Sequence, residues 1–215
     1  MEIKGYERFH IGIKISTMIN IQELKSLVVE LCNGVDGFEP IETTSIPFNL
    51  ADLQGFAIDS LFEKDGVNIH INIPSNALNF VGKEPDKVTK VFEEVLGLII
   101  SSEKYEEESL SLFYETICDV ILSNTKKPSE ILKEITNLKL DSFSDMGSLS
   151  IGSILLTGEE DGSSDDNSAL KLNLSCHPSR PSKDFLLQIT KRNKSKEDVL
   201  ENYEKIKTDA LQLIQ

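Results

Sequence analysis

Tryptophan is absent from this sequence, and cysteine is scarce, with three residues in 215. Cys32, Cys118 and Cys176 are too few and too far apart to form a disulfide framework. Two of them fall on apolar faces, which is typical of buried thiols in a reducing compartment. We therefore expect a core of Ile, Leu, Val and Phe that needs no covalent cross-links.

Long hydrophobic runs are also missing. The longest apolar run, residues 95–100, contains a glycine and is far too short to span a bilayer. The first residues, Met1–Gly5, lack the apolar core of a signal peptide. These two observations predict a cytoplasmic protein that does not enter a membrane.

Positive charge is sparse, because 22 Lys and Arg residues stand against 36 Asp and Glu residues, for a formal net charge of −14. Such a surface repels a phosphate backbone unless a local basic patch outweighs it. The densest basic run, residues 191–196, lies where a predicted strand is followed by a helix, and acidic residues come next. We interpret this run as a solvated turn, so neither nucleic acid nor an anionic membrane is an expected partner.

The sequence does contain clear periodicity. Residues 9–15 alternate between apolar and polar types, which predicts a half-buried strand, and the apolar stripe of residues 21–31 predicts a helix. A turn at 64–66 joins two further strands into a hairpin. A short strand at 78–80 and a helix that begins at Pro85 complete the first half of the chain.

After an acidic connector at 103–108 the same order repeats. The second half is predicted to contain a strand at 110–122, a helix from 128, strands at 149–156, 170–176 and 185–189, and a final helix capped by Ser195. We therefore predict an α+β fold of two similar β-α-β-β-β-α halves, residues 1–105 and 106–215, forming one compact unit. Antiparallel strands would carry the helices on one face.

This order of elements resembles the TATA-binding-protein-like fold, whose halves run strand, helix, antiparallel strands, helix in tandem. The resemblance covers the whole chain and is one of topology. The strand turns lack the glycine-rich signature of the true TATA-binding proteins, to which only Leu78–Lys83 has some similarity. The resemblance implies a fold, and DNA binding is not carried over with it. Other split β-α-β arrangements remain alternatives.

Polar positions on the predicted strands form two stripes at a spacing of two residues, which places each stripe on one face of its strand. If both halves share one sheet, the stripes could form a continuous polar face for a partner. The alternative is that an antiparallel sheet simply has one wet face. The candidate binding residues are His10, Lys14, Asn68, His70, Asn72, Lys171, Asn173 and His177.

No motif for catalysis, metal or cofactor binding is evident. The three histidines are too far apart for a local zinc motif. The loop 159–167 is rich in oxygen ligands but fails the EF-hand pattern, because Asp166 stands where glycine is required. The acidic run 106–108 is interpreted as a solvated connector, and no nucleophile elbow or phosphate-binding loop is present. We expect no cofactor and no metal, and we assign no catalytic residue.

Two hypotheses of function follow. The first is a binding or assembly protein that uses the polar sheet face to hold a protein partner or to form a homodimer. The alternative is an enzyme or small-molecule sensor with a pocket between the two halves. In that case His10 and His70 are the candidate acid and base groups, and Lys14 is the candidate contact for an anion. The sequence alone does not decide whether the protein is an enzyme.

Overall fold

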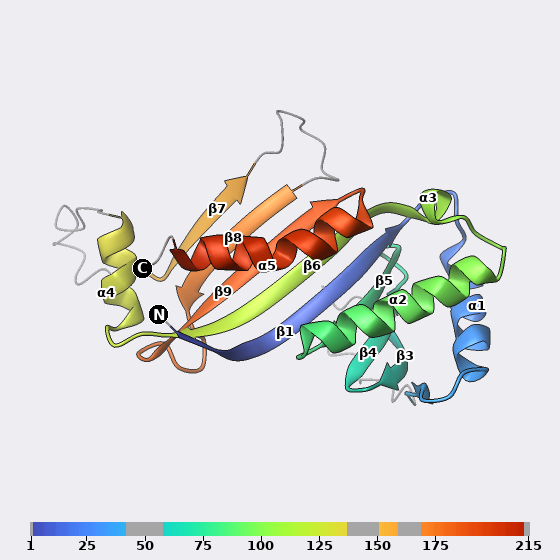
Figure 1. Cartoon of the computed structure of the whole chain (residues 1–215), viewed down its shortest axis with the longest axis horizontal. Coiled ribbons are helices and arrows are strands. Elements are labelled where there is room, and N and C mark those ends of the chain that lie inside the picture. Colours follow the sequence, from blue (N-terminus) through green and yellow to red (C-terminus); the bar gives the residue numbers. More distant parts are fainter. Residues whose placement is uncertain (1, 42–57, 137–150, 159–168, 213–215) are drawn as a thin grey trace, which may run out of the picture.

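The computed structural model describes residues 2–41, 58–136, 151–158 and 169–212. These residues form an α+β fold with one nine-stranded antiparallel sheet, in the order β2-β3-β4-β5-β1-β6-β9-β8-β7 (Figure 1). This confirms the predicted α+β class with an antiparallel sheet. In chain order the elements are β1 (Glu2–Ile15), α1 (Ile21–Asn33), β2 (Glu39–Pro40), β3 (Ile58–Lys64), β4 (Val67–Asn72), β5 (Ala77–Gly82), α2 (Pro85–Ser101), α3 (Glu107–Leu110), β6 (Ser111–Ser123), α4 (Pro128–Thr136), β7 (Ser153–Gly158), β8 (Ala169–Cys176), β9 (Asp184–Asn193) and α5 (Lys196–Gln212).

The middle of the sheet is formed by its two longest strands. β1 has 14 residues and β6 has 13, and they pair antiparallel from Glu2 opposite Ser123 to Ile15 opposite Ser111. The strands that precede α2 lie on the β1 side, and those that follow β6 lie on the other side. The two halves of the chain therefore share one continuous sheet, which the sequence alone could not establish.

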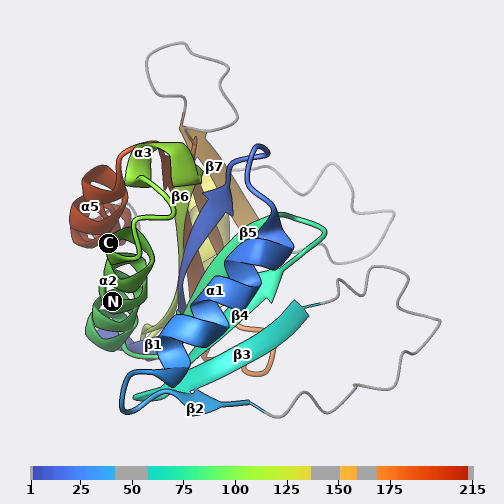
Figure 2. The ribbon, with the colours of Figure 1, turned by 90° about the vertical axis from the view of Figure 1, so that its right-hand side faces the viewer.

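The helices α2 and α5 lie along the same side of this sheet (Figure 2). α2 contacts β1, β4 and β5, while α5 contacts β6 and β9. β1 points Phe9, Ile11 and Ile13 into the layer between sheet and helices, where they are buried. The alternation of apolar and polar residues that predicted the strand thus sets which of its faces packs against the helices.

Some local features differ from the sequence-based expectation. The sheet includes a short strand, β2, that the sequence analysis did not predict, and the short helix α3 begins within the predicted acidic connector. Gly152 precedes β7, and its carbonyl accepts a hydrogen bond from Cys176 N at 3.1 Å. The loop 159–167, which was considered as a calcium site, lies outside the described residues.

Candidate functional site

The two faces of the sheet present different side chains. In the central strands β1, β4 and β5, the residues that point toward the helices are apolar and mostly buried. Residues at alternate positions point to the opposite face, called the open face here. The open face contains His10, Gly12 and Lys14 of β1, Ser60 of β3, Asn68, His70 and Asn72 of β4, Asn79 of β5, Glu115 and Asp119 of β6, and Gln188 and Arg192 of β9.

His10 is fixed on the open face by Asn79 of the neighbouring strand. Its Nε2 donates a hydrogen bond to Asn79 Oδ1 at 2.9 Å. Gly12, which pairs with Asn79 across the strands, leaves room for this contact. A Cβ at position 12 would lie 3.1 Å from Asn79 Oδ1 and 3.2 Å from His10 Nε2. Desolvation lowers the pKa of His10, because burial disfavours the charged imidazolium.

His70 extends this arrangement toward the sheet edge. It pairs with Asn79 across the strands, and its Nδ1 lies 3.0 Å from Ser60 Oγ, whose hydroxyl can rotate to donate a hydrogen bond. Desolvation lowers the pKa of His70, and repulsion from His10 acts in the same direction. Ser60, His70, Asn79 and His10 thus form a polar row that crosses β3, β4, β5 and β1.

Charged residues of the open face are neutralised by partners on adjacent strands. Arg8 donates to Asp119 Oδ2 at 2.9 Å, and Gln188 donates to the other carboxylate oxygen, also at 2.9 Å. Arg192 pairs with Glu115, and its guanidinium lies 5.2 Å from the centre of the Phe113 ring. The centre of this face is therefore close to neutral although the whole chain is strongly acidic.

A hollow of about 370 Å³ opens where the strands of the two halves meet. Lys14 lies in it and donates a hydrogen bond to the backbone carbonyl of Ser75. The rest of the lining comes from β1, β4, β5, β6, β9 and the turn after β4, and consists of Gly12, Ile13, Asn72, Ser75, Ala77, Asn79, Phe113, Glu115 and Arg192. A hollow of about 490 Å³ lies toward the start of α2 and includes Arg8, Asn68 and Lys87. Neither hollow is lined by His10 or His70.

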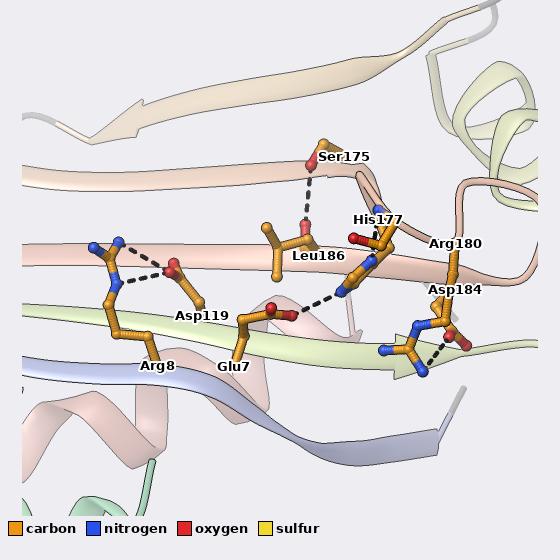
Figure 3. A network of polar contacts seen from close by, with 9 residues as sticks. Glu7, Arg8, Asp119, Ser175, His177, Arg180, Asp184 and Leu186 are labelled. Carbon is orange, nitrogen blue, oxygen red and sulfur yellow. Dashed lines mark hydrogen bonds and ion pairs between the residues drawn. The ribbon is translucent and has the colours of Figure 1, made fainter. Parts of the chain in front are cut away.

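The candidate residues of the second half have different surroundings. Lys171 is exposed on β8, and Asn173 has a buried side-chain oxygen with no hydrogen-bond partner within the described ranges. His177 lies one residue beyond β8 and is only 3% exposed. Its Nδ1 accepts a hydrogen bond from Ser179 N, so Nε2 carries the proton and donates to Glu7 at 2.8 Å (Figure 3). His177 thus joins the loop after β8 to β1.

A second set of polar contacts that joins β1 to β9 lies beside His177. Asp184, which is 1% exposed, is bound by Lys4 at 2.8 Å. It is also bound by Arg180 at 3.1 Å (Figure 3). The hydrogen bond from Lys4 lowers the pKa of the Asp184 carboxyl, and the charge of Arg180 acts in the same direction. Lys4 belongs to β1, so this cluster holds the start of β1 against β9. The neighbourhood of His177 is accordingly built from internal contacts.

The structure brings five of the eight candidate residues together. His10 and Lys14 on β1 and Asn68, His70 and Asn72 on β4 lie on either side of β5. The strands β4 and β8 are five strand spacings apart, which corresponds to about 24 Å. The stripe on β8 is consequently separate from the stripe on β4, and the two do not form one compact site.

Several residues of the open face were not among the sequence-based candidates, namely Arg8, Ser60, Asn79, Glu115, Asp119, Gln188 and Arg192. Asn79 could have been found, because it alternates with Leu78 and Phe80 in a predicted strand. The pairs Arg8 with Asp119 and Arg192 with Glu115 depend on the register between strands distant in sequence, for which a single sequence gives no signal.

Other kinds of site find no support in the described part of the chain. No group of three or more His, Cys, Asp or Glu residues in these ranges is placed to hold a metal ion. Burial raises the pKa of the Cys32 thiol to about 11, which is the opposite of an activated nucleophile. Of the described helices, none has the length and apolar character needed to cross a bilayer.

Comparisons with known proteins add no family assignment. No protein-family model matches the chain, and no curated protein matches its sequence. The case for a function therefore depends on the residues and contacts of the open face.

Proposed function

We propose that this is a binding protein whose open face holds a protein partner. The supporting observation is the polar row of Ser60, His70, Asn79 and His10, whose side chains are fixed by hydrogen bonds before a partner arrives. Preorganised side chains lose little conformational entropy on association, so more of each contact contributes to affinity. The ion pairs of Arg8 with Asp119 and of Arg192 with Glu115 also leave the centre of the open face near neutral, which lowers the local repulsion of an acidic partner by a chain of net charge −14.

The proposal assigns the recognition of the partner to β1, β4 and β5. His70 and Asn68 are half-buried neighbours on one face of β4, and each presents polar atoms to the open face. Polar side chains on rigid strands suit recognition of a polypeptide, because they can both donate and accept hydrogen bonds. His10, Lys14 and Asn72 complete this binding surface, while Lys171, Asn173 and His177 lie too far away to act with it.

The test compares a double variant on the open face with a matched double variant on α1. Asn68→Ala with His70→Ala removes two open-face side chains, and Gln22→Ala with Glu30→Ala removes two exposed side chains of α1. The protein captured by tagged wild type is identified and purified, and its Kd for each variant is measured. We expect the open-face variant to weaken binding by at least about tenfold, as for contacts near an interface centre. Equal Kd values for wild type and the open-face variant would overturn the proposal.

A second candidate function is the binding of a small anionic molecule in the hollow between the halves. The observation that favours it is that Lys14 of β1 and Arg192 of β9 both line that hollow, together with Phe113 of β6, over which the Arg192 guanidinium lies. Native mass spectrometry of purified protein would reveal a retained small molecule, and Lys14→Met should abolish its retention. A clean apo mass for wild type would remove this candidate.

We further propose that the chain is a structural duplication with the topology of the TATA-binding-protein-like fold, forming one compact unit of residues 1–105 and 106–215. Outward from β1 the order is β5, β4, β3, and outward from β6 it is β9, β8, β7, so the two sequences of strands correspond. In each half a helix follows the central strand, and another follows the last. Separately expressed halves that unfold alone but combine into a folded complex would support this proposal, and an independently stable half would contradict it.

A further inference from the structure

The strand β7 forms one edge of the sheet and has an unusual composition for an edge. Its six residues, Ser153–Gly158, include three consecutive apolar side chains and no charge or proline. Leu155 is 62% exposed and Leu156 is 48% exposed. Successive residues of a strand point to opposite faces, so these two leucines expose apolar surface on both faces of the same edge.

The opposite edge of the sheet is protected in ways that β7 is not. β2 has two residues, and one of them is Pro40, which has no backbone N–H to offer. Short strands, proline and charge are the usual means by which proteins prevent unwanted pairing at a sheet edge. β8 and β7 pair along six residue positions, and the outer side of β7 faces no strand in the described ranges. β7 therefore has the main-chain groups and the length needed to pair with another strand.

We propose that β7 pairs antiparallel with β7 of a second copy of this chain, which would join two sheets into one. A two-fold axis perpendicular to the sheet would pass between the two copies of Leu155. In this register each residue faces one that lies an even number of positions from it in the sequence, and only such registers keep the helices of both copies on one side of the joined sheet. Leu155 would then lie opposite Leu155 of the second copy. Ile154 would lie opposite Leu156, and Ser153 opposite Thr157.

A second copy is the occupant that the composition of this edge favours. Two chains of net charge −14 repel each other, so they can approach only where charge is absent, and β7 has none. The strand is also its own complement, because the proposed register places apolar residues opposite apolar residues and polar Ser153 opposite polar Thr157. An interface of this kind uses the same patch on both subunits, as closed two-fold symmetry requires.

The pairing would also cover apolar surface on the helix side of the sheet. Ile154 and Leu156 point to that side together with Leu170 and Leu172 of β8, and these residues are at best half-buried. Bringing Ile154 of one copy against Leu156 of the other removes part of this surface from water. Main-chain hydrogen bonds would supply direction, and the side chains would supply the driving force.

The first experiment measures oligomeric state by sedimentation equilibrium over a range of protein concentrations. We expect wild type to dimerise reversibly and Leu155→Asp to weaken the dimer by at least tenfold, because the variant places two carboxylates opposite each other. Met18→Asp is the matched control, since Met18 is 95% exposed on the loop after β1. It should dimerise as wild type does. A wild-type protein that stays monomeric, or dimers of equal strength in all three proteins, would overturn the proposal.

A second experiment tests the register itself by disulfide formation. Under mild oxidation Leu155→Cys should give a covalent dimer, because two copies of residue 155 meet on the axis. Thr157→Cys should cross-link far less, because the two copies of residue 157 would be about 13 Å apart along the strands. The reverse preference would exclude this register. The Asn68→Ala with His70→Ala variant must leave the dimer unchanged, so failure of the open-face proposal and failure of this one give different results.

Discussion

The two halves of the sheet bury their outer strands to different extents. In the first half, Phe62, Ile69 and Ile71 on β3 and β4 are fully buried, whereas in the second half Leu170 and Leu172 on β8 are only half-buried. The first helices of the two halves also differ in length and in the number of side chains that they bury. α1 has 13 residues, contacts α2 and buries four of its side chains, while α4 has nine residues and buries three.

The comparison teaches that two groups of strands arranged in a similar order on either side of β1 and β6 need not be buried to the same extent. The polar row lies in the first half of the sheet, and the exposed apolar side chains lie in the second half. The first half combines a complete core with a preorganised polar row, and the second half leaves the leucines of β7 near the surface. A complete core allows a strand to hold polar side chains rigidly on its other face. An incomplete core leaves apolar surface that association can bury.

The largest expected effect is on stability. It comes from truncating an apolar residue that points toward the helices in each half and comparing the losses in the free energy of unfolding. Ile71→Ala on β4 should lower the free energy of unfolding by about 2–5 kcal/mol, because it opens a cavity in a fully packed layer. Leu172→Ala on β8 removes a side chain that is only half-buried, so this variant should lose about 1 kcal/mol in the free energy of unfolding. Equilibrium urea unfolding measures both values. Equal losses would mean that the second half is as well packed as the first.

How much of this arrangement could be predicted depends on the distance over which the interactions act. Val67, Ile69 and Ile71 alternate with polar residues along β4 and are all buried, and such a pattern can be read from the sequence because strand parity is a local property. His177 was expected on an extended polar stripe, but β8 ends at Cys176, and a contact with Glu7, 170 residues away, determines its orientation. The helices were predicted from their periodicity, yet nothing in that pattern indicated that α1 would pack against α2 and α4 against β8.

A second prediction uses pH to distinguish the halves. His10 and His70 both lie in the first half, and burial lowers the pKa of each below the ordinary value of 6.5. In the unfolded chain these histidines take up protons at a higher pH than in the folded protein. The folded state should therefore be most stable above about pH 6.5 and lose stability as the pH falls below that value.

The measurement is urea unfolding at a series of pH values from 8 down to about 5.5, chosen to stay above the titration of ordinary carboxylates. His10→Gln with His70→Gln should flatten the profile, because glutamine keeps hydrogen-bonding capacity and cannot take up a proton in this range. Glu115 and Asp119 favour the charged form of His10 and Arg8 opposes it, so desolvation has to outweigh the carboxylates for the effect to have this sign. A profile that rises on acidification would contradict the prediction.

The smallest expected effect concerns the glycine that makes room for the polar row. Gly12→Ala places a methyl group 3.1 Å from Asn79 Oδ1 and 3.2 Å from His10 Nε2, which is closer than such groups normally approach. The hydrogen bond between His10 and Asn79 must lengthen or break, and we expect a loss of about 1 kcal/mol in the free energy of unfolding. Gly152→Ala is the matched control in the second half, because its Cβ would meet nothing within 4 Å.

If the polar row is the binding surface, Gly12→Ala should also weaken partner binding, whereas Gly152→Ala should leave the Kd unchanged. Equal stability and equal Kd for the two variants would show that the contact between His10 and Asn79 contributes to neither property.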